Sequence, residues 1–213
     1  SSHVKSLKDL IQTISHSFGK ENDPAVLIIG EEGTGKDLLA RYLHQTILGP
    51  HRPFVVFNCT DNSLTEESLK IFNETTQGTV YLNEIGDLSL KMQIWLFEWL
   101  QSSNEQKPRV HIMASTSRDL SRLVSENMFR EDLYFRMNTF PLSLAPLRSR
   151  TEDISVLANY FLESFCKDRK KKFSGISSSA LRALENYRWP GNILELKNVI
   201  ERAALIEKRP VLE

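Results

Sequence analysis

The amino-acid sequence predicts an α/β fold, in which a mostly parallel five-stranded sheet flanked by helices is followed by a small helical subdomain. Between residues 26 and 142, short apolar runs alternate with segments of helical periodicity, the pattern of a parallel sheet. From about Leu147 onward only helical patterns remain. Residues 30–37 form a glycine-rich segment directly after the first apolar run, as in a P-loop. We therefore expect an α/β nucleotide-binding subdomain at residues 1–146 and a helical lid subdomain at residues 147–213.

Each expected element follows from its local pattern. Apolar runs rich in β-branched and aromatic residues indicate strands at residues 26–29, 54–57, 79–84, 110–114 and 140–142. Apolar residues at helical spacing indicate helices at residues 4–18, 38–47, 90–100, 154–166, 177–187 and 193–207, with a short helical patch in the polar stretch 61–77. The basic run at residues 167–172 is typical of a solvated loop or helix end rather than a DNA site.

Composition argues against several classes of function. Lys and Arg total 27 and Asp and Glu total 27, so no bulk charge favours nucleic acid or a membrane surface. Any DNA contact would come from a local patch or from another domain. Cys59 and Cys166 match no metal or redox spacing. No apolar run approaches the roughly 18 residues of a membrane helix, so we expect a cytoplasmic protein without membrane contact.

The glycine-rich segment has the residues that bind phosphate. Glycines allow positive φ angles and let backbone N–H groups converge on an anion, which a Cβ would obstruct. The following helix adds the partial positive charge of its N-terminus, and Lys36 adds a full charge that can reach the β- and γ-phosphates. Asp37 stands where a Ser or Thr usually supplies a hydroxyl to Mg²⁺. The simpler alternative is a turn that only joins a strand to a helix.

A family resemblance extends over nearly the whole chain. Segments 30–37, 58–59, 78–88, 109–120, 129–141, 147–154 and 189–202 resemble, in this order, the AAA+ domain of sigma-54-dependent bacterial enhancer-binding proteins. The stretch 129–136 and the Trp-Pro-Gly-Asn run at 189–192 are highly specific. The resemblance implies an AAA+ P-loop NTPase fold with a helical lid, in which residue 37 is usually Glu, so that Asp37 is a mild change there.

The resemblance also assigns roles to single residues. The nucleotide-binding positions that it implies in the loop are Gly30, Gly33, Thr34, Gly35, Lys36, Asp37 and Leu38. Glu84 matches the Walker B glutamate that polarises the attacking water. Asn58 matches the asparagine that holds this glutamate until hydrolysis is licensed, and Thr116 sits at the sensor I position.

Two arginines match residues that act across a subunit interface. Arg130 and Arg136 occupy the positions of arginines that reach a neighbouring subunit's nucleotide, contacts worth roughly 10³–10⁵ in rate in related phosphoryl-transfer enzymes. In a monomer, the alternative is a local salt bridge with Glu131 or Asp132.

Three departures from the family pattern weaken the case for hydrolysis or for contact with sigma-54. Asn83 replaces the Walker B aspartate, so that Asp37 and Asn83 would contact Mg²⁺ only weakly, through water. Leu194 replaces the sensor II arginine at a nucleotide-binding position of the lid, a contact worth up to about 4 kcal/mol at ~4 Å and an effective dielectric near 20. The inserted loop with a Gly-Ala-Phe-Thr-Gly-Ala motif, which contacts sigma-54, is absent between residues 67 and 79.

These features favour a nucleotide-binding regulator over a sigma-54 activator. We expect ATP or ADP to bind, with Mg²⁺ weakened, and the nucleotide state to set self-association as a dimer or hexameric ring. The alternatives are a working ATPase ring with arginines acting in trans and a module that responds to a cyclic dinucleotide. By family analogy, DNA would bind a helix-turn-helix domain outside this chain, and RNA polymerase would be contacted without the sigma-54 loop.

Overall fold

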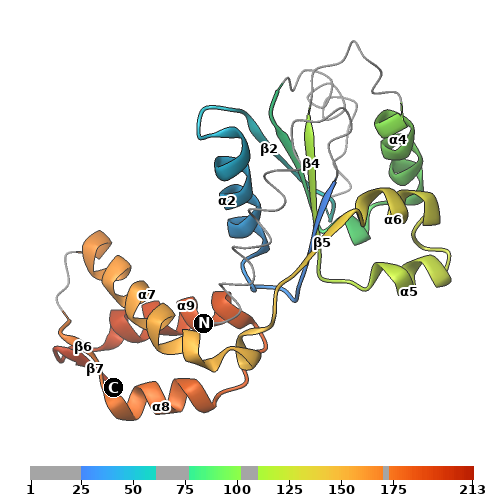
Figure 1. The fold of residues 1–213 in the computed structure, drawn as a ribbon. Helices are drawn as coiled ribbons and strands as arrows, with labels where there is room; N and C mark the ends of the chain where they lie inside the picture. The colour runs from blue at the N-terminus through green and yellow to red at the C-terminus, as the bar shows by residue number, and fades with distance from the viewer. Residues whose placement is uncertain (1–24, 61–76, 102–109, 170–172) are drawn as a thin grey trace. The chain divides into compact units, whose positions relative to one another are not determined.

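The computed structural model describes residues 25–60, 77–101, 110–169 and 173–213, which form two compact units. The α/β unit contains the described residues up to Leu144 except Glu31–Gly35 (Figure 1). The second unit, here called the lid unit, combines Glu31–Gly35 with Ala145–Glu213. The helix expected at residues 4–18, the helical patch expected after residue 61 and the missing sigma-54 loop all fall outside the described residues.

Five parallel strands form the sheet of the α/β unit, which confirms the sheet that the sequence predicts. In spatial order the strands are β2 (Phe54–Asn58), β3 (Thr79–Asn83), β4 (His111–Thr116), β1 (Val26–Ile29) and β5 (Phe140–Ser143). Ile29 lies opposite Thr116 on one side and Ser143 on the other. Because parallel strands end at the same edge of a sheet, the segments that follow β1, β3 and β4 meet there.

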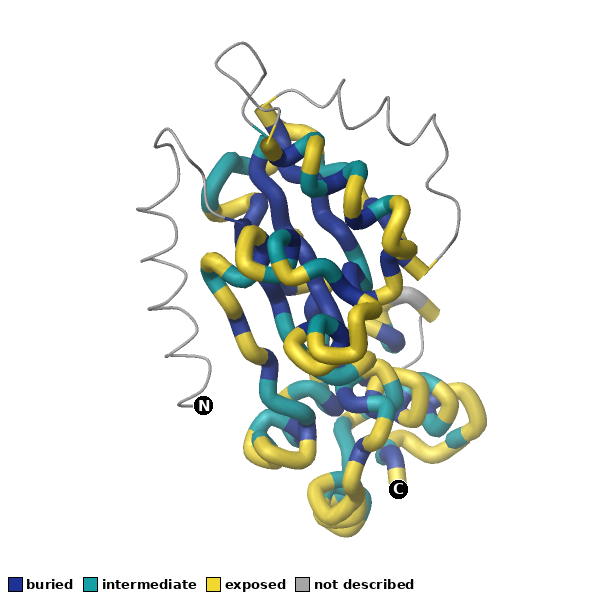
Figure 2. The backbone as a smooth tube through the Cα atoms, turned by 90° about the vertical axis from the view of Figure 1, so that its right-hand side faces the viewer, coloured by how far each residue is buried: buried dark blue, intermediate teal, exposed yellow. Residues whose placement is uncertain are grey.

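Helices cover both faces of this sheet (Figure 1). On one face α2 (Lys36–Leu48) packs Leu39 and Leu43 against Val26 and Ile28 of β1. The other face carries α4 (Leu90–Gln101), α5 (Leu120–Ser125) and α6 (Glu131–Met137), whose apolar residues join Leu27 of β1 in a separate core. Alternate strand residues therefore enter different cores, and both faces are apolar. This is why β3 and β4 are almost entirely buried (Figure 2) and appear in the sequence as continuous apolar runs.

The lid unit is built mainly from helices. Its longer elements are α7 (Ile154–Arg169), α8 (Ser178–Asn186) and α9 (Asn192–Ile206), preceded by the 3₁₀ turns η2 (Leu147–Ser149) and η3 (Thr151–Asp153). Trp189 is 2 % exposed at the centre of their apolar core and donates from Nε1 to the Leu184 carbonyl at 2.7 Å. The basic run begins inside the last turn of α7, as expected for a helix end.

The expectation of helices alone after Leu147 is wrong in one respect. Two short parallel strands, β6 (Gly175–Ile176) and β7 (Val211–Leu212), pair in the lid unit. Each is only two residues long, which is too short for an alternating pattern to be visible in the sequence.

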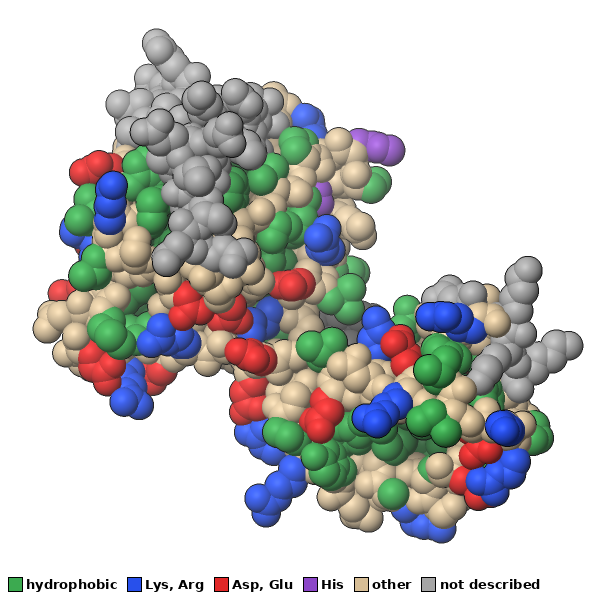
Figure 3. Space-filling model, turned by 180° about the vertical axis from the view of Figure 1, so that it is seen from behind, with side chains coloured by type: hydrophobic (Ala, Val, Ile, Leu, Met, Phe, Trp, Pro, Cys, Tyr) green, Lys and Arg blue, Asp and Glu red, His purple; other side chains and the backbone are tan. Residues whose placement is uncertain are grey.

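The surface agrees with the balanced charge of the sequence. On the face drawn in Figure 3, basic and acidic side chains intermingle over each unit. Among the described residues, no helix is both long enough and apolar enough to cross a membrane.

Candidate functional site

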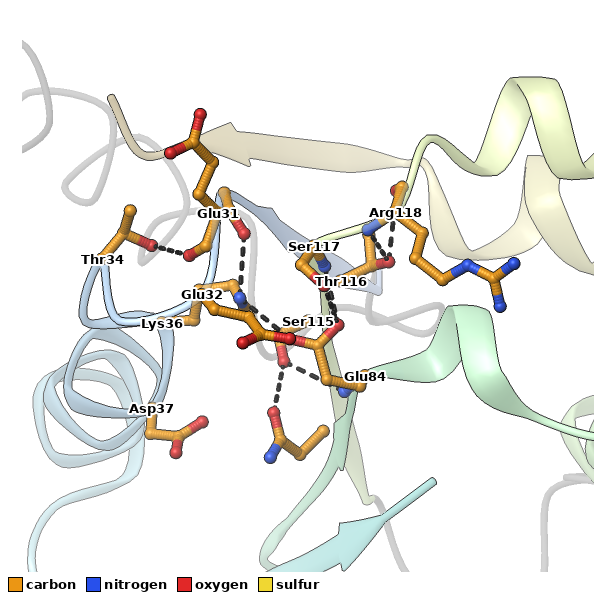
Figure 4. A network of polar contacts seen from close by, with 12 residues as sticks. Glu31, Glu32, Thr34, Lys36, Asp37, Glu84, Ser115, Thr116, Ser117 and Arg118 are labelled. Atoms are coloured by element: carbon orange, nitrogen blue, oxygen red, sulfur yellow. Dashed lines mark hydrogen bonds and ion pairs between the residues drawn. The ribbon is translucent and has the colours of Figure 1, made fainter. Parts of the chain in front are cut away.

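The glycine-rich loop leads directly into α2, and Lys36 is the first residue of that helix. The Lys36 Nζ donates to the Gly30 carbonyl at 2.8 Å and lies 2.9 Å from Glu84 Oε1 (Figure 4). The two side chains are only 7 % and 14 % exposed, so this ion pair is well shielded from water. The N-terminus of α2 adds partial positive charge at the carboxyl edge of the sheet, where the Lys36 ammonium is paired with the Glu84 carboxylate.

Glu84 follows β3 in an unusual backbone conformation. Its φ and ψ are both 56°, in the left-handed region, which costs of order 1–3 kcal/mol for a residue with a side chain. Ser117, just after β4, donates to Glu84 Oε2 from its backbone N–H at 2.7 Å and from its hydroxyl at 2.9 Å. Burial raises the pKa of Glu84, but the hydrogen bonds from Lys36 and Ser117 outweigh burial and hold the pKa below its ordinary value. Strain of this kind is concentrated at functional sites in proteins.

A buried polar network connects α2 with β3 and β4. The Tyr81 hydroxyl donates to Asp37 Oδ1 at 2.6 Å and lies 2.8 Å from the Ser115 hydroxyl. Ser115 in turn reaches Asn83 Oδ1 at 2.9 Å, and its oxygen is 3.4 Å from the Glu84 backbone nitrogen. Burial, followed by the interaction with Asp37, raises the pKa of Tyr81, so the phenol keeps its proton. Asp37 Oδ1 and Asn83 Oδ1 are therefore linked through the Tyr81 and Ser115 hydroxyls.

The apex of the loop belongs to the lid unit. Gly33 has φ +72°, and its carbonyl accepts from the backbone N–H groups of Ile193 at 2.9 Å and Leu194 at 3.3 Å. A Cβ built on Gly33 would stand 2.3 Å from the Gly191 carbonyl oxygen. Thr34 is 2 % exposed. This loop position thus requires glycine both for its φ angle and for the close approach of the backbone that precedes α9.

Side chains of the lid unit also bind the loop at Glu31 and Glu32. Arg148 donates to both carboxylate oxygens of Glu31 at 2.6 and 2.7 Å, and Asn192 Nδ2 donates to Glu31 Oε2 at 3.2 Å. These bonds lower the pKa of Glu31 to about 2. Asn192 is fully buried, donates also to the Glu32 carbonyl at 2.9 Å and accepts from the Leu147 N–H at 2.8 Å. The loop apex is therefore fixed by side chains from two separate parts of the lid unit.

Leu194 stands at an open position of the lid unit. Its side chain is 57 % exposed and borders a cavity of about 300 Å³. The residues that line the cavity are Gly191, Leu194, Glu195, Asn198, Val199 and Arg202. Arg150 is a further cation near the loop: it donates from Nη2 to the Thr34 carbonyl at 3.2 Å, and burial lowers its pKa.

The sequence matches the profiles of two known protein families. The profile of the sigma-54 interaction domain matches residues 1–147, and that of the AAA+ ATPase lid domain matches residues 148–213. The chain belongs to the sigma-54 interaction domain family. The P-loop, the parallel sheet and the helical lid that we predict from the sequence are those of this family.

Curated relatives of this sigma-54 interaction domain are bacterial transcriptional regulators. The regulatory protein AtoC of Escherichia coli is 38 % identical over 214 residues, covering 88 % of this chain and 46 % of AtoC. The transcriptional regulatory protein ZraR of Klebsiella oxytoca is 39 % identical over 211 residues, covering 87 % and 48 %. The chain therefore spans less than half the length of these relatives.

Solved structures resemble the domain over almost its whole length. NtrX from Brucella abortus in complex with ATP has a TM-score of 0.80 and 26 % sequence identity, covering 97 % of this chain and 49 % of NtrX. The complex of the same protein with ADP has a TM-score of 0.79 and 27 % identity, covering 95 % and 50 %.

The remaining residues with an expected role lie at the ends of elements in the sigma-54 interaction domain. Asn58 ends β2, and its Oδ1 accepts from the Thr60 backbone N–H at 3.4 Å and hydroxyl at 2.9 Å. Thr116 ends β4, is 1 % exposed and exchanges hydrogen bonds with the Arg118 backbone at 3.0 and 3.2 Å. Among the described residues, it is Lys36 and Ser117, rather than Asn58 or Thr116, that hold the Glu84 carboxylate.

The two arginines differ in their surroundings. Arg130 precedes α6 and donates to both oxygens of Asp132 at 3.0 and 2.6 Å, which is the local salt bridge considered as the alternative to a role in trans. Arg136, in the last turn of α6, is exposed to solvent.

Several residues of the site escape sequence reasoning. Ser117, Tyr81 and Ser115 take part in the network through pairing of β3 with β4, and Arg148 and Asn192 reach the loop from far along the chain. Ser117 follows the end of an expected strand, which is a signal that could have identified it. For Tyr81 and Ser115, which lie inside apolar strands, the sequence carries no such signal.

Proposed function

We propose that this domain binds ATP or ADP and that the nucleotide state controls its self-association, with weak or absent hydrolysis and without remodelling of sigma-54. One observation carries the binding part of the proposal. The Lys36 ammonium lies at the N-terminus of α2, next to a loop whose glycines have φ angles of +72° and +98°. Backbone N–H groups and a lysine in this arrangement bind phosphate without further side chains. The complexes of NtrX with ATP and ADP support the same conclusion.

The weak hydrolysis that we propose rests on the groups around Glu84. The Glu84 carboxylate already accepts from Lys36 and Ser117, and these bonds, which hold its pKa below the ordinary value, support a weak role as a base toward water. Asn83 adds no negative charge for a metal ion, and Leu194 offers no guanidinium to a γ-phosphate. Within this proposal, Gly33, Thr34, Gly35 and Lys36 bind the phosphates.

Titration calorimetry of the domain with ATP and with ADP tests the binding. We expect both nucleotides to bind and Lys36→Ala to abolish binding, because the substitution removes the only full positive charge of residues 30–37. Lys91→Ala, at an exposed lysine of α4, is the matched control and should bind like the unmodified domain. Absence of binding at millimolar nucleotide would refute the proposal.

Mass measurement with and without nucleotide tests the control of self-association. We expect the average mass to rise or fall when ATP or ADP is added, and the change to disappear in Lys36→Ala. An unchanged mass in the presence of bound nucleotide would disprove this part and leave the binding intact. Further domains of the whole protein, a DNA-binding helix-turn-helix among them, and contact with RNA polymerase belong to the proposal by family analogy.

A working ATPase ring is the second candidate, and the exposure of Arg136 favours it. An arginine in the last turn of α6 that faces solvent is accessible to a neighbouring subunit. Phosphate release that rises steeply with protein concentration and is lost in Arg136→Ala would establish this function in place of weak hydrolysis. Turnover lost in Glu84→Gln would point the same way.

A further inference from the structure

The side chains expected on the metal side of the nucleotide already have protein partners. Asp37 Oδ1 accepts from the Tyr81 hydroxyl at 2.6 Å, and Asn83 Oδ1 is 2.9 Å from the Ser115 hydroxyl. Glu84 Oε1 is 2.9 Å from the Lys36 ammonium, and Glu84 Oε2 accepts from the Ser117 backbone N–H at 2.7 Å. Each of these oxygen atoms therefore has a hydrogen-bonded or ionic partner from the chain.

This arrangement does not fit a resident magnesium ion. Mg²⁺ demands nearly octahedral oxygen coordination and is usually bound through one or two carboxylates together with substrate phosphates. Of the two side chains expected to contact Mg²⁺, Asn83 is neutral, and Asp37 accepts a hydrogen bond from Tyr81, which is 1 % exposed. The part of the chain that the structure describes contains no group of three or more His, Cys, Asp and Glu residues that could hold a metal ion.

The groups that would bind phosphate need no metal. Lys36 carries a full charge at the N-terminus of α2, a helix of 13 residues, and the glycines that precede it in the chain have φ angles that suit an anion cradle. All of these act on the phosphate oxygens themselves. A metal ion would add charge on the side where Tyr81 already donates to Asp37 Oδ1 and Ser115 donates to Asn83 Oδ1.

We propose that the site takes the free anion of a nucleoside diphosphate or triphosphate rather than its magnesium complex. The inference rests on the nucleotide binding proposed above and specifies the form of the ligand. Tyr81 and Asn83 are the residues that determine this preference. The Tyr81 hydroxyl donates to the carboxylate of Asp37, and Asn83 places a neutral amide at the end of β3, where an aspartate would carry a negative charge.

Titration calorimetry with ATP in excess EDTA and in excess Mg²⁺ tests the inference. We expect binding in EDTA to be at least as tight as in Mg²⁺, because the metal withdraws the free anion from solution. A Kd that is lower in Mg²⁺ by about threefold or more would overturn the inference while leaving the proposed function standing. Absence of binding in both media would overturn the proposed function itself, so the two failures are distinguishable.

Asn83→Asp should reverse the preference. The substitution changes almost no volume and places a second carboxylate near Asp37, which repels the free anion and offers an oxygen ligand to the metal. We expect the ratio of Kd in EDTA to Kd in Mg²⁺ to rise by about tenfold or more. Asn186→Asp, at an exposed position in the last turn of α8, makes the same charge change and should leave the ratio unaltered.

A second variant keeps the test independent of how well Asn83→Asp folds. Tyr81→Phe retains the buried ring and removes the hydroxyl that donates to Asp37 Oδ1. We expect it to shift the ratio in the same direction by a smaller factor, with the circular dichroism spectrum unchanged. A ratio that stays constant in both folded variants would overturn the assignment of the preference to these residues.

Discussion

Replacing Gly33 by alanine tests the packing of the glycine loop within the lid unit. At φ +72° an L-residue pays roughly 1–2 kcal/mol of backbone strain. The new Cβ would also stand 2.3 Å from the Gly191 carbonyl oxygen and 3.1 Å from the Leu194 Cβ, and the nearer atom is backbone, which cannot rotate away. Relief of such overpacking typically costs a further 1–3 kcal/mol. We therefore expect Gly33→Ala to lower the free energy of unfolding by about 2–5 kcal/mol.

Part of this cost would fall on the hydrogen bonds around the loop. The Gly33 carbonyl accepts from Ile193 at 2.9 Å and Leu194 at 3.3 Å, and a shift that relieves the clash would lengthen both bonds. Each is worth about 0.5–1.5 kcal/mol. The clash and the weakened hydrogen bonds are alternative sources of the same destabilisation, because a loop that moves to relieve the clash lengthens the bonds. Their energies are therefore not added.

Gly49→Ala supplies a matched control. Gly49 has φ +82°, but nothing lies within 4 Å of its Cβ position, so only the backbone strain of about 1–2 kcal/mol applies. Thermal unfolding by calorimetry, supported by urea titration, should show Gly33→Ala to be the more destabilised by about 1–3 kcal/mol. Equal destabilisation of the two variants would mean that the loop does not press on the backbone before α9.

Two further predictions concern charged groups of the site. The folded pKa of Glu84 lies below its unfolded value of roughly 4.3, so its contribution to stability is complete above that pH and disappears as the pH falls through the lower folded value. Glu84→Gln should therefore reduce the fall in the free energy of unfolding at acid pH, as measured by urea unfolding between about pH 3 and 6. An unchanged dependence on pH would contradict the ion pair with Lys36. Arg148→Ala should raise the pKa of Glu31 from about 2 toward the ordinary value, as followed by NMR titration, with little loss of stability because the pair is half exposed; a pKa that stays near 2 would refute the bidentate contact.

The sequence predicts the sheet well because each strand depends on a local pattern. The five apolar runs are visible as strands before pairing is known, and their ends differ from the observed ones by at most two residues. The carboxyl edge follows from the parallel order, and it places Asn58, Glu84 and Thr116 at strand ends. The P-loop is recognised for the same reason, since its glycines and Lys36 are contiguous.

The contacts that define the site depend on pairing that periodicity does not reveal. Ser117 meets Glu84 only because β3 and β4 are neighbours and because Glu84 adopts a left-handed conformation. Asn192 reaches Glu31 across 161 positions of the chain, and Arg148 reaches it across 117. No local pattern encodes such distances, although the unusual run of Trp, Pro, Gly and Asn at 189–192 does mark the turn that makes the first of them.

Binding and hydrolysis place opposite demands on the centre of this site. Phosphate binding needs the Lys36 ammonium, which in the described structure contacts the Gly30 carbonyl and Glu84. A bound phosphate would draw Lys36 toward itself and weaken one of the contacts that keep Glu84 acidic. Ser117 would still hold the other carboxylate oxygen through two hydrogen bonds, at 2.7 and 2.9 Å. Ligand binding therefore frees Glu84 only in part, which is why we expect this site to bind nucleotide more readily than it hydrolyses it.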